Sequence, residues 1–177
     1  KISNRAAVPT MISYGFKPNE IRKAFRHRKA DEVLDFLADS RPKIYQRYEK
    51  IENVIKEKVK NRIYPFCWLD ECYPENLQGL DNMPVLLWAR GDVRKLSEKV
   101  NVAVIGTRTP TSYGAKMAQR IVSLLVSRGC NVISGLALGC DTIAHSETVK
   151  AHGTTCAVLP SGVDNPIPAS NKNLSDE

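Results

Sequence analysis

Residues 106–112 combine a glycine, several hydroxyl side chains and one guanidinium in a single short loop. The loop follows the apolar stretch 102–105 and leads into a sequence that begins a helix. Backbone N–H groups at the start of a helix attract anions, and an arginine holds a phosphate through two parallel hydrogen bonds. The spacing therefore predicts an anion-binding turn, with donors at Gly106, Thr107, Arg108 and Ser112.

Two later loops are expected at the same edge of the fold. Residues 134–141 contain Gly135 and Gly139, which allow the backbone to approach a ligand closely, and residues 160–172 follow the next strand. In parallel α/β sheets, ligands bind outside the carboxyl ends of the strands. An isolated glycine at a strand end often does no more than form a turn, but three such loops at one edge favour a binding site.

Several rival chemistries fit this region less well. The first turn lacks the G-x-G-x-x-G spacing, Ser134 stands where a dinucleotide-binding protein carries an acidic residue, and no G-x-x-x-x-G-K-[ST] occurs. Asp141 and His145 are spaced as a catalytic pair could be, but no nucleophile can be placed beside them. We therefore expect Asp141 to cap its helix and Cys140 to be buried.

The elements that position these loops alternate between strand and helix. Strands are expected at 100–105, 131–134 and 154–159, and helices at 112–128, at 140–151 and from 171. This order predicts right-handed βαβ units on a parallel sheet. Two upstream strands, at 62–69 and 85–89, are expected to join that sheet together with further strands beyond Glu177, although Pro65 argues against a central position.

Residues 1–60 show helical periodicity, with helices beginning near residues 18, 30 and 42. They carry fifteen Lys and Arg against eight Asp and Glu, whereas residues 61–177 carry eleven of each, so the net charge of +7 lies in the N-terminal third. A basic face attracts nucleic acid, but a solvated helical surface explains the charge equally well. The predicted fold is α/β: a Rossmann-like, mostly parallel sheet with flanking helices over 61–177, preceded by a small all-α domain over 1–60.

Composition restricts the class of protein. The chain of 177 residues is 42% hydrophobic and contains no apolar run long enough to span a membrane. The N-terminus does not resemble a signal peptide and lacks an initiator Met, which suggests trimming or a fragment. The five cysteines are not spaced as a zinc site, so reduced thiols in a cytoplasmic protein are expected, with no metal and no cofactor.

Two motifs in serial order resemble those of the DNA-processing protein A (DprA/Smf) family. GTRTPTSYG at 106–114 is similar to the family's G-[ST]-R-x-P-[ST]-x-Y-G, and SGLALGCDTIAH at 134–145 is similar to its S-G-x-A-x-G-I-D-x-x-A-H. Further likeness covers 157–164, 167–174 and the upstream segments 73–77 and 84–92. The N-terminal helices correspond loosely to the helical, sterile-alpha-motif-like domain that many members carry.

The resemblance implies a single-stranded-DNA-binding protein that loads a RecA-type recombinase during natural transformation, acts as a dimer and has no known catalysis. It implies that the first turn binds the DNA backbone and that the second motif lines the same pocket. It also implies that the loop before the last helix faces the DNA. The DNA-binding residues it implies are Gly106, Thr107, Arg108, Ser112, Ser134, Gly135, Gly139, Asn171 and Lys172.

Three departures from the family pattern stand out. Cys140 replaces the usual isoleucine, Ile167 replaces the usual tyrosine, and the sequence stops near Glu177, where members continue through further strands. The alternative function is that of a nucleoside-phosphate hydrolase of the phosphoribohydrolase type. Such enzymes carry P-G-G-x-G-T-x-x-E, and the nearest turn here, residues 160–162, leads instead to Asp164. A partial domain retained for protein–protein contact is a third possibility.

Overall fold

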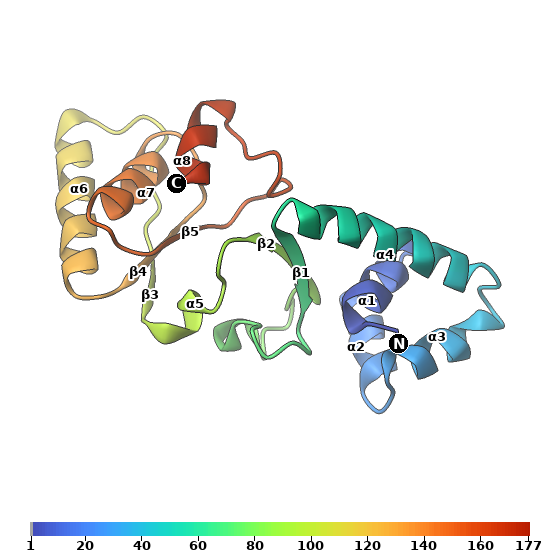
Figure 1. Cartoon of the computed structure of the whole chain (residues 1–177). Helices are drawn as coiled ribbons and strands as arrows, with labels where there is room; N and C mark the ends of the chain where they lie inside the picture. The colour runs from blue at the N-terminus through green and yellow to red at the C-terminus, as the bar shows by residue number, and fades with distance from the viewer. Residues whose placement is uncertain (1) are drawn as a thin grey trace. The chain divides into compact units, whose positions relative to one another are not determined.

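The computed structural model describes residues 2–177 and divides into two compact units (Figure 1). One unit ends at Val93 and the other comprises Arg94–Glu177. The boundary predicted from the sequence lies at residue 60. The two boundaries differ because residues 61–93 belong to the first unit in the structure.

Helices make up most of the first unit, as predicted for residues 1–60. They are α1 (Asn4–Ser13), α2 (Pro18–Phe25), α3 (Ala30–Ala38) and α4 (Ile44–Lys60). The residues of α1 are not predicted from the sequence as a separate helix. This helix contains Pro9, although proline in the interior of a helix usually disrupts it. It forms nevertheless, because its apolar face is fully buried against the other helices, with Ala7, Val8 and Met11 at 0% exposure.

The two upstream strands do not join the parallel sheet, so that expectation is wrong. Strands β1 (Ile63–Cys67) and β2 (Leu86–Arg90) pair with each other, antiparallel, in a separate two-stranded sheet. Pro65 is tolerated because both strands of such a sheet are edge strands. Between them lies the short 3-10 turn η1 (Glu75–Leu77).

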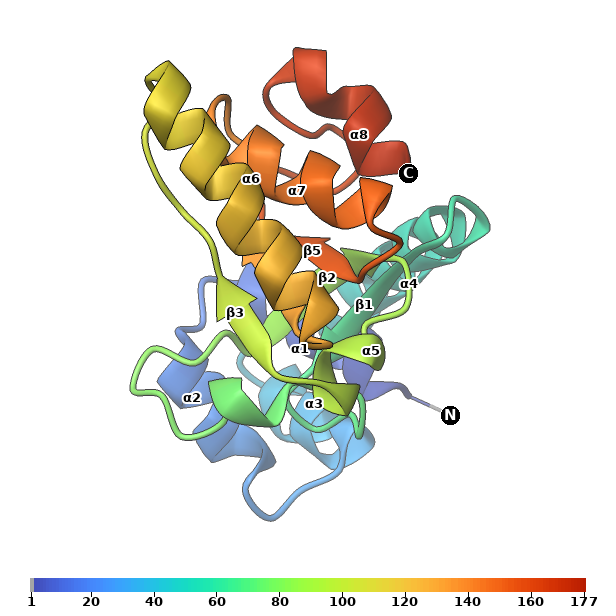
Figure 2. The same ribbon diagram turned by 90° about the vertical axis from the view of Figure 1, so that its left-hand side faces the viewer.

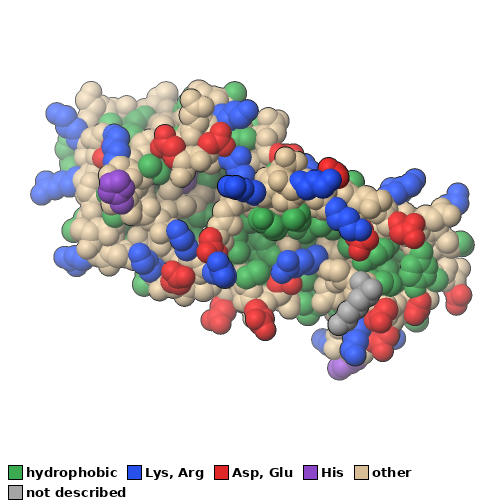
Figure 3. All heavy atoms as spheres, in the orientation of Figure 1, with side chains coloured by type: hydrophobic (Ala, Val, Ile, Leu, Met, Phe, Trp, Pro, Cys, Tyr) green, Lys and Arg blue, Asp and Glu red, His purple; other side chains and the backbone are tan. Residues whose placement is uncertain are grey.

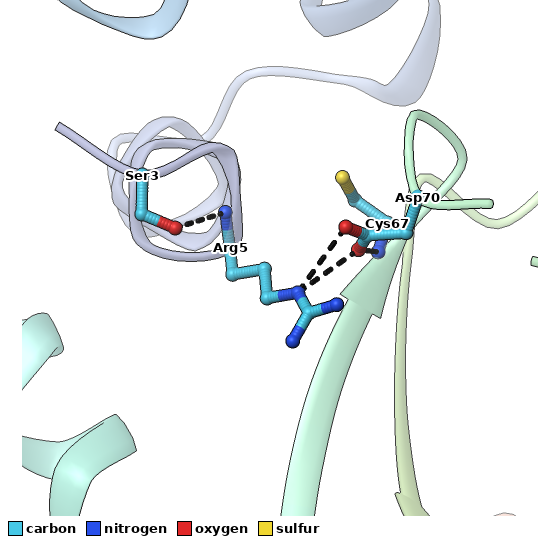
Figure 4. A network of polar contacts seen from close by, with 4 residues as sticks. All are labelled: Ser3, Arg5, Cys67 and Asp70. Carbon is cyan, nitrogen blue, oxygen red and sulfur yellow. Dashed lines mark hydrogen bonds and ion pairs between the residues drawn. The ribbon is translucent and has the colours of Figure 1, made fainter. Parts of the chain in front are cut away.

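This antiparallel pair belongs to the helical unit because it helps to form that unit's core. Cys67 and Val85 lie in the same buried cluster as the helical side chains, and Phe25 packs edge-on against Trp68 with ring centroids 5.7 Å apart. Arg5 of α1 also donates from Nε to both carboxylate oxygens of Asp70, at 3.2 and 3.3 Å, just beyond β1 (Figure 4). The first unit is therefore not all-α.

The second unit contains the predicted parallel sheet. Strands β3 (Asn101–Ala103), β4 (Asn131–Ser134) and β5 (Thr155–Ala157) lie in the order β3-β4-β5, and Val132 pairs with both Val102 and Thr155. The connecting helices are α6 (Ser112–Ser127) and α7 (Cys140–Lys150). Shorter elements precede and follow them: α5 (Lys95–Glu98), η2 (Ala169–Asn171) and α8 (Lys172–Asp176).

Helices α6 and α7 lie side by side across one face of this sheet (Figure 2). The core between them is small and contains Val122, Val132 and Ala144. Ile105 and Val158, which lie just beyond the ends of β3 and β5, are 79% and 65% exposed. No helix within residues 2–177 is both long and apolar enough to cross a membrane.

Candidate nucleic-acid interface

The first loop runs from the end of β3 to the first residue of α6. Thr111 caps the helix, because its hydroxyl oxygen accepts a hydrogen bond from the N–H of Gly114 at 3.1 Å, and its carbonyl accepts from Ala115. The N–H groups of Ser112 and Tyr113 have no partner within the helix, as is usual in a first turn. They leave a partial positive charge at this end of α6.

Arg108 lies in this loop with its side chain exposed, and its guanidinium makes no hydrogen bond or ion pair with any residue in 2–177. The loop is shaped locally by the hydroxyl of Thr107, which accepts from the N–H of Thr109 at 3.2 Å. Gly106, Thr107 and Ser112 are also exposed. The first loop thus presents a free cation next to the open end of a helix.

The first and second loops touch through their glycines. A Cβ on Gly139 would lie 2.5 Å from the carbonyl oxygen of Arg108 and would also overlap that of Thr107, and Gly139 has a φ of +79°. A Cβ on Gly106 would lie 2.6 Å from the Sγ of Cys140, whose backbone N–H donates to the Thr107 carbonyl at 3.1 Å. These two glycines are required for the loops to pack together, and Cys140 is half-buried against Gly106 rather than fully buried as expected.

Asp141 holds the second loop rather than capping its own helix. Gly139 occupies the N-cap position of α7, and the Asp141 Oδ2 accepts from the N–H groups of Gly135 and Ala137, at 3.1 and 3.3 Å. The prediction that Asp141 caps α7 is therefore wrong, because its carboxylate accepts hydrogen bonds from the loop that precedes the helix. Because the carboxylate is negative and Asp141 is only 7% exposed, this helix end is a poorer anion site than that of α6.

Ser134 also has a structural role. It is 3% exposed, and its hydroxyl donates to the carbonyl of Val104 at 2.7 Å, which joins the ends of β4 and β3. Gly135 lies close to Asp141, since a Cβ there would be 2.9 Å from Oδ2. Both residues shape the site without presenting side-chain donors to a ligand.

The third loop reaches the second through Asn171. This residue is 6% exposed, and its Nδ2 donates to the Leu136 carbonyl at 2.9 Å and to the Thr142 hydroxyl at 2.8 Å. The neighbouring Lys172 begins α8 and is exposed. All three predicted loops therefore meet at the carboxyl edge of the sheet.

His145 does not form a catalytic pair with Asp141. It is 2% exposed, and its Nδ1 lies 2.7 Å from the Thr155 hydroxyl, which itself donates to the Val132 carbonyl. That hydroxyl has one hydrogen, so Nδ1–H is the donor to it, and the buried Nε2 has no partner among the described residues. Burial lowers the pKa of His145 below 6.5, opposed by the charge of Asp141, so the ring is neutral near pH 7.

Tyr113 is a further candidate contact residue that was not predicted from the sequence. It is 75% exposed in the first turn of α6, directly after Ser112. The tyrosine is part of the 106–114 motif, but only its exposure shows that it is available to a ligand. In residues 2–177 no three His, Cys, Asp or Glu side chains cluster as a metal site would require.

This fold defines a class: a Rossmann-like domain whose loops gather at the carboxyl ends of the parallel strands, the edge at which such domains bind ligands. The chain belongs to the DNA recombination-mediator protein A family, which it matches over residues 65–177.

Known relatives support this assignment. The chain is 33% identical over 146 residues to the DNA processing protein DprA of Streptococcus pneumoniae, covering 82% of this chain and 51% of that protein. It is 31% identical over 133 residues to DprA of Bacillus subtilis, covering 75% and 45%. The chain thus spans about half the length of these curated relatives.

Solved structures agree. The crystal structure of Streptococcus pneumoniae DprA superposes with a TM-score of 0.66 and 28% identity, over 98% of this chain and 59% of that one. DNA processing protein A from Helicobacter pylori, described for its single-stranded-DNA-binding mode, gives a TM-score of 0.54 and 28% identity over 65% and 51%.

Proposed function

We propose that the loop edge of the second unit binds the phosphate backbone of single-stranded DNA. The observation that carries the proposal is the exposed, unpaired guanidinium of Arg108 beside the open N-terminus of α6, within the described residues 2–177. Gly106, Thr107 and Ser112 would approach the phosphate with it, and Lys172 would add a second cation. The single-stranded-DNA-binding mode described for the Helicobacter pylori protein supports the choice of ligand.

The remaining predicted residues would act by positioning. Ser134 and Asn171 are buried and use their polar atoms on the protein itself, while Gly135 and Gly139 let the loops approach each other. Their contribution would therefore be a rigid loop edge rather than direct donors. Preorganised donors lose less entropy on binding, so this rigidity raises affinity.

The exposed Tyr113 would add a stacking surface for a base. Base–aromatic stacking tolerates any base, and phosphate contacts carry no sequence information. The proposed binding is therefore tolerant of sequence and sensitive to salt.

In the complete protein this binding would serve a recombination mediator. We infer that such a protein works in the cytoplasm as a homodimer, hands single-stranded DNA to a RecA-type recombinase in natural transformation, and is not an enzyme. The family match and the DprA relatives support the mediator role. The five free cysteines suit a reducing compartment.

The test is a titration of fluorescent oligo-dT with the purified chain at about 50 and 200 mM salt, where phosphate contacts weaken steeply. The proposal expects saturable binding at the lower salt and a clear loss at the higher. A parallel assay incubates the chain with nucleoside monophosphates and measures free base. Base release without oligo-dT binding would contradict the proposal and support the hydrolase alternative.

A further inference from the structure

The densest run of positive charge in the chain lies where α2 passes into α3. Between Glu20 and Asp31 there is no acidic residue, and the segment contains Arg22, Lys23, Arg26, Arg28 and Lys29. Four of these, Lys23, Arg26, Arg28 and Lys29, are exposed, and they are called the α2–α3 cluster below. The cluster accounts for much of the positive excess of the N-terminal third.

Three cations of the cluster have no direct partner in the described chain. The side chains of Lys23, Arg26 and Lys29 make no hydrogen bond or ion pair with any residue of the described chain. Arg22 differs, because it donates to Asn19 and, at 3.4 Å, to the Asp81 carbonyl. The side chains of Lys23, Arg26 and Lys29 are therefore available to an external anion.

Helix α4 shows the opposite pattern and serves as an internal comparison. Its Lys56 pairs with Glu52 at 2.9 Å and its Lys60 pairs with Glu57 at 2.6 Å, both along the helix surface. On the face drawn in Figure 3, Asp and Glu side chains lie among the Lys and Arg side chains over α4. This is a solvated charge face, so a high content of lysine alone does not define a binding surface.

One cation of the cluster is held in place by an exposed aromatic ring. The guanidinium carbon of Arg28 lies 4.7 Å from the ring centroid of Phe36, and Phe36 is 64% exposed. Stacking on a ring leaves the edge N–H groups of a guanidinium free to donate to a phosphate. The exposed ring also offers a surface on which a nucleobase can stack.

We propose that the α2–α3 cluster, with Phe36, is a second phosphate-binding surface for single-stranded DNA, carried by the first unit. The choice of DNA as the occupant rests on the proposed function. Free cations beside an exposed aromatic are the combination by which proteins hold single strands without reading sequence. An acidic protein partner would need the same charges but would leave DNA binding unaffected by their loss.

The test compares two variants of the 177-residue chain that lose the same charge. One carries Lys23→Gln, Arg26→Gln, Arg28→Gln and Lys29→Gln. The control carries Lys50→Gln, Lys56→Gln, Lys58→Gln and Lys60→Gln on α4. Oligo-dT affinity is measured from about 50 to 200 mM salt, and thermal unfolding confirms that both variants fold.

The cluster variant is expected to bind at least about ten-fold more weakly at the lower salt. Its salt slope is expected to fall by up to about 3, since each lost phosphate contact on a single strand removes about 0.7. The α4 control is expected to keep the slope of the parent chain. Phe36→Ala, a milder second variant, is expected to weaken binding without changing net charge.

The outcomes separate this proposal from the proposed function. If Arg108→Ala weakens binding but the cluster variant matches the α4 control, the second surface is overturned and the loop site stands. If the cluster variant loses affinity and slope while Arg108→Ala does not, the second surface stands and the loop assignment falls. Equal losses in the cluster variant and the α4 control would show a general charge effect and would also overturn the second surface.

Discussion

The loop edge forms only where certain residues lack a side chain, and Gly139 has the least space for one. Its φ is +79°, and a Cβ at this position would overlap the carbonyl oxygens of Thr107 and Arg108, so there is no room for a side chain. We expect Gly139→Ala to separate the first two loops and to weaken oligo-dT binding about as much as losing Arg108 does. The measurement is oligo-dT affinity together with the free energy of unfolding.

Gly114→Ala is the matched control for that substitution. Gly114 lies in the first turn of α6, where the nearest atom to a Cβ would be the Thr111 hydroxyl oxygen at 3.4 Å. Alanine favours helix over glycine by roughly 0.5–1 kcal/mol, so stability should be unchanged or slightly higher. Equal damage from the two substitutions would show that the loop contact is not the cause.

His145 links stability to pH. Burial lowers its pKa in the folded state below 6.5, so below that pH the unfolded chain binds a proton that the folded chain resists. Stability is therefore complete above about pH 6.5 and is lost as the pH falls, by at most about 1.4 kcal/mol per pH unit from this group. Urea unfolding from pH 7 to 5 measures the slope.

His145→Asn should reduce that slope, because the amide can still donate to Thr155 but does not titrate. His152→Asn, at an exposed position with a φ of +55° that Asn tolerates, is the control. The account of His145 fails if both variants keep the parent slope.

The side chain of Asn171 joins the third loop to the second. Asn171→Ala removes the donor to the carbonyl of the buried Leu136, and leaving such a buried carbonyl unpaired costs about 1–3 kcal/mol. We expect a comparable fall in the free energy of unfolding. Asn173→Ala, at an exposed site in the adjoining helix α8, should change stability little.

Lys172→Ala separates positioning from contact within the same loop. The side chain is exposed, so its removal should lower oligo-dT affinity without lowering stability. A loss of stability instead would place Lys172 with Asn171 among the positioning residues.

The convergence of the three loops could be predicted because it depends only on strand order and local spacing. Parallel strands bring their carboxyl ends to one edge whatever the side chains in between. The partners of Asp141 and Asn171 could not be predicted, because Asp141 bonds to backbone groups of the loop directly before it and Asn171 to a backbone group of a distant loop, and several such groups are equivalent in the sequence. The pairing of β1 with β2 was missed for a similar reason: both are short apolar runs that fit either sheet.

The position of the boundary between the two units can be tested by truncating the chain. Cys67 and Val85 lie in the helical core, so a chain cut at residue 60 loses part of that core, whereas one cut after Val93 keeps it. We expect residues 1–93 to unfold cooperatively on heating and residues 1–60 to lack a cooperative transition, as followed by circular dichroism. Cooperative unfolding of 1–60 alone would favour the boundary expected from the sequence.

Helices α6 and α7 pack against one face of the sheet of the second unit (Figure 2), and the chain spans about half the length of its curated relatives. The loop edge is nevertheless held together by contacts within residues 94–177. Thr107 packs against Gly139, and Asn171 donates to the Leu136 carbonyl. The proposed phosphate contact can therefore be tested in this chain itself.

The most direct test of that contact compares two arginines at opposite ends of one helix. Arg108 precedes α6, and Arg128 is its exposed C-cap residue, so Arg108→Ala and Arg128→Ala remove the same charge at the two ends. A hydrogen-bonded charge contributes about 1.5–3 kcal/mol, so Arg108→Ala should weaken oligo-dT binding at low salt about ten-fold or more, and Arg128→Ala should change it little. Unchanged affinity of Arg108→Ala, or equal losses in the two variants, would contradict phosphate binding at this loop.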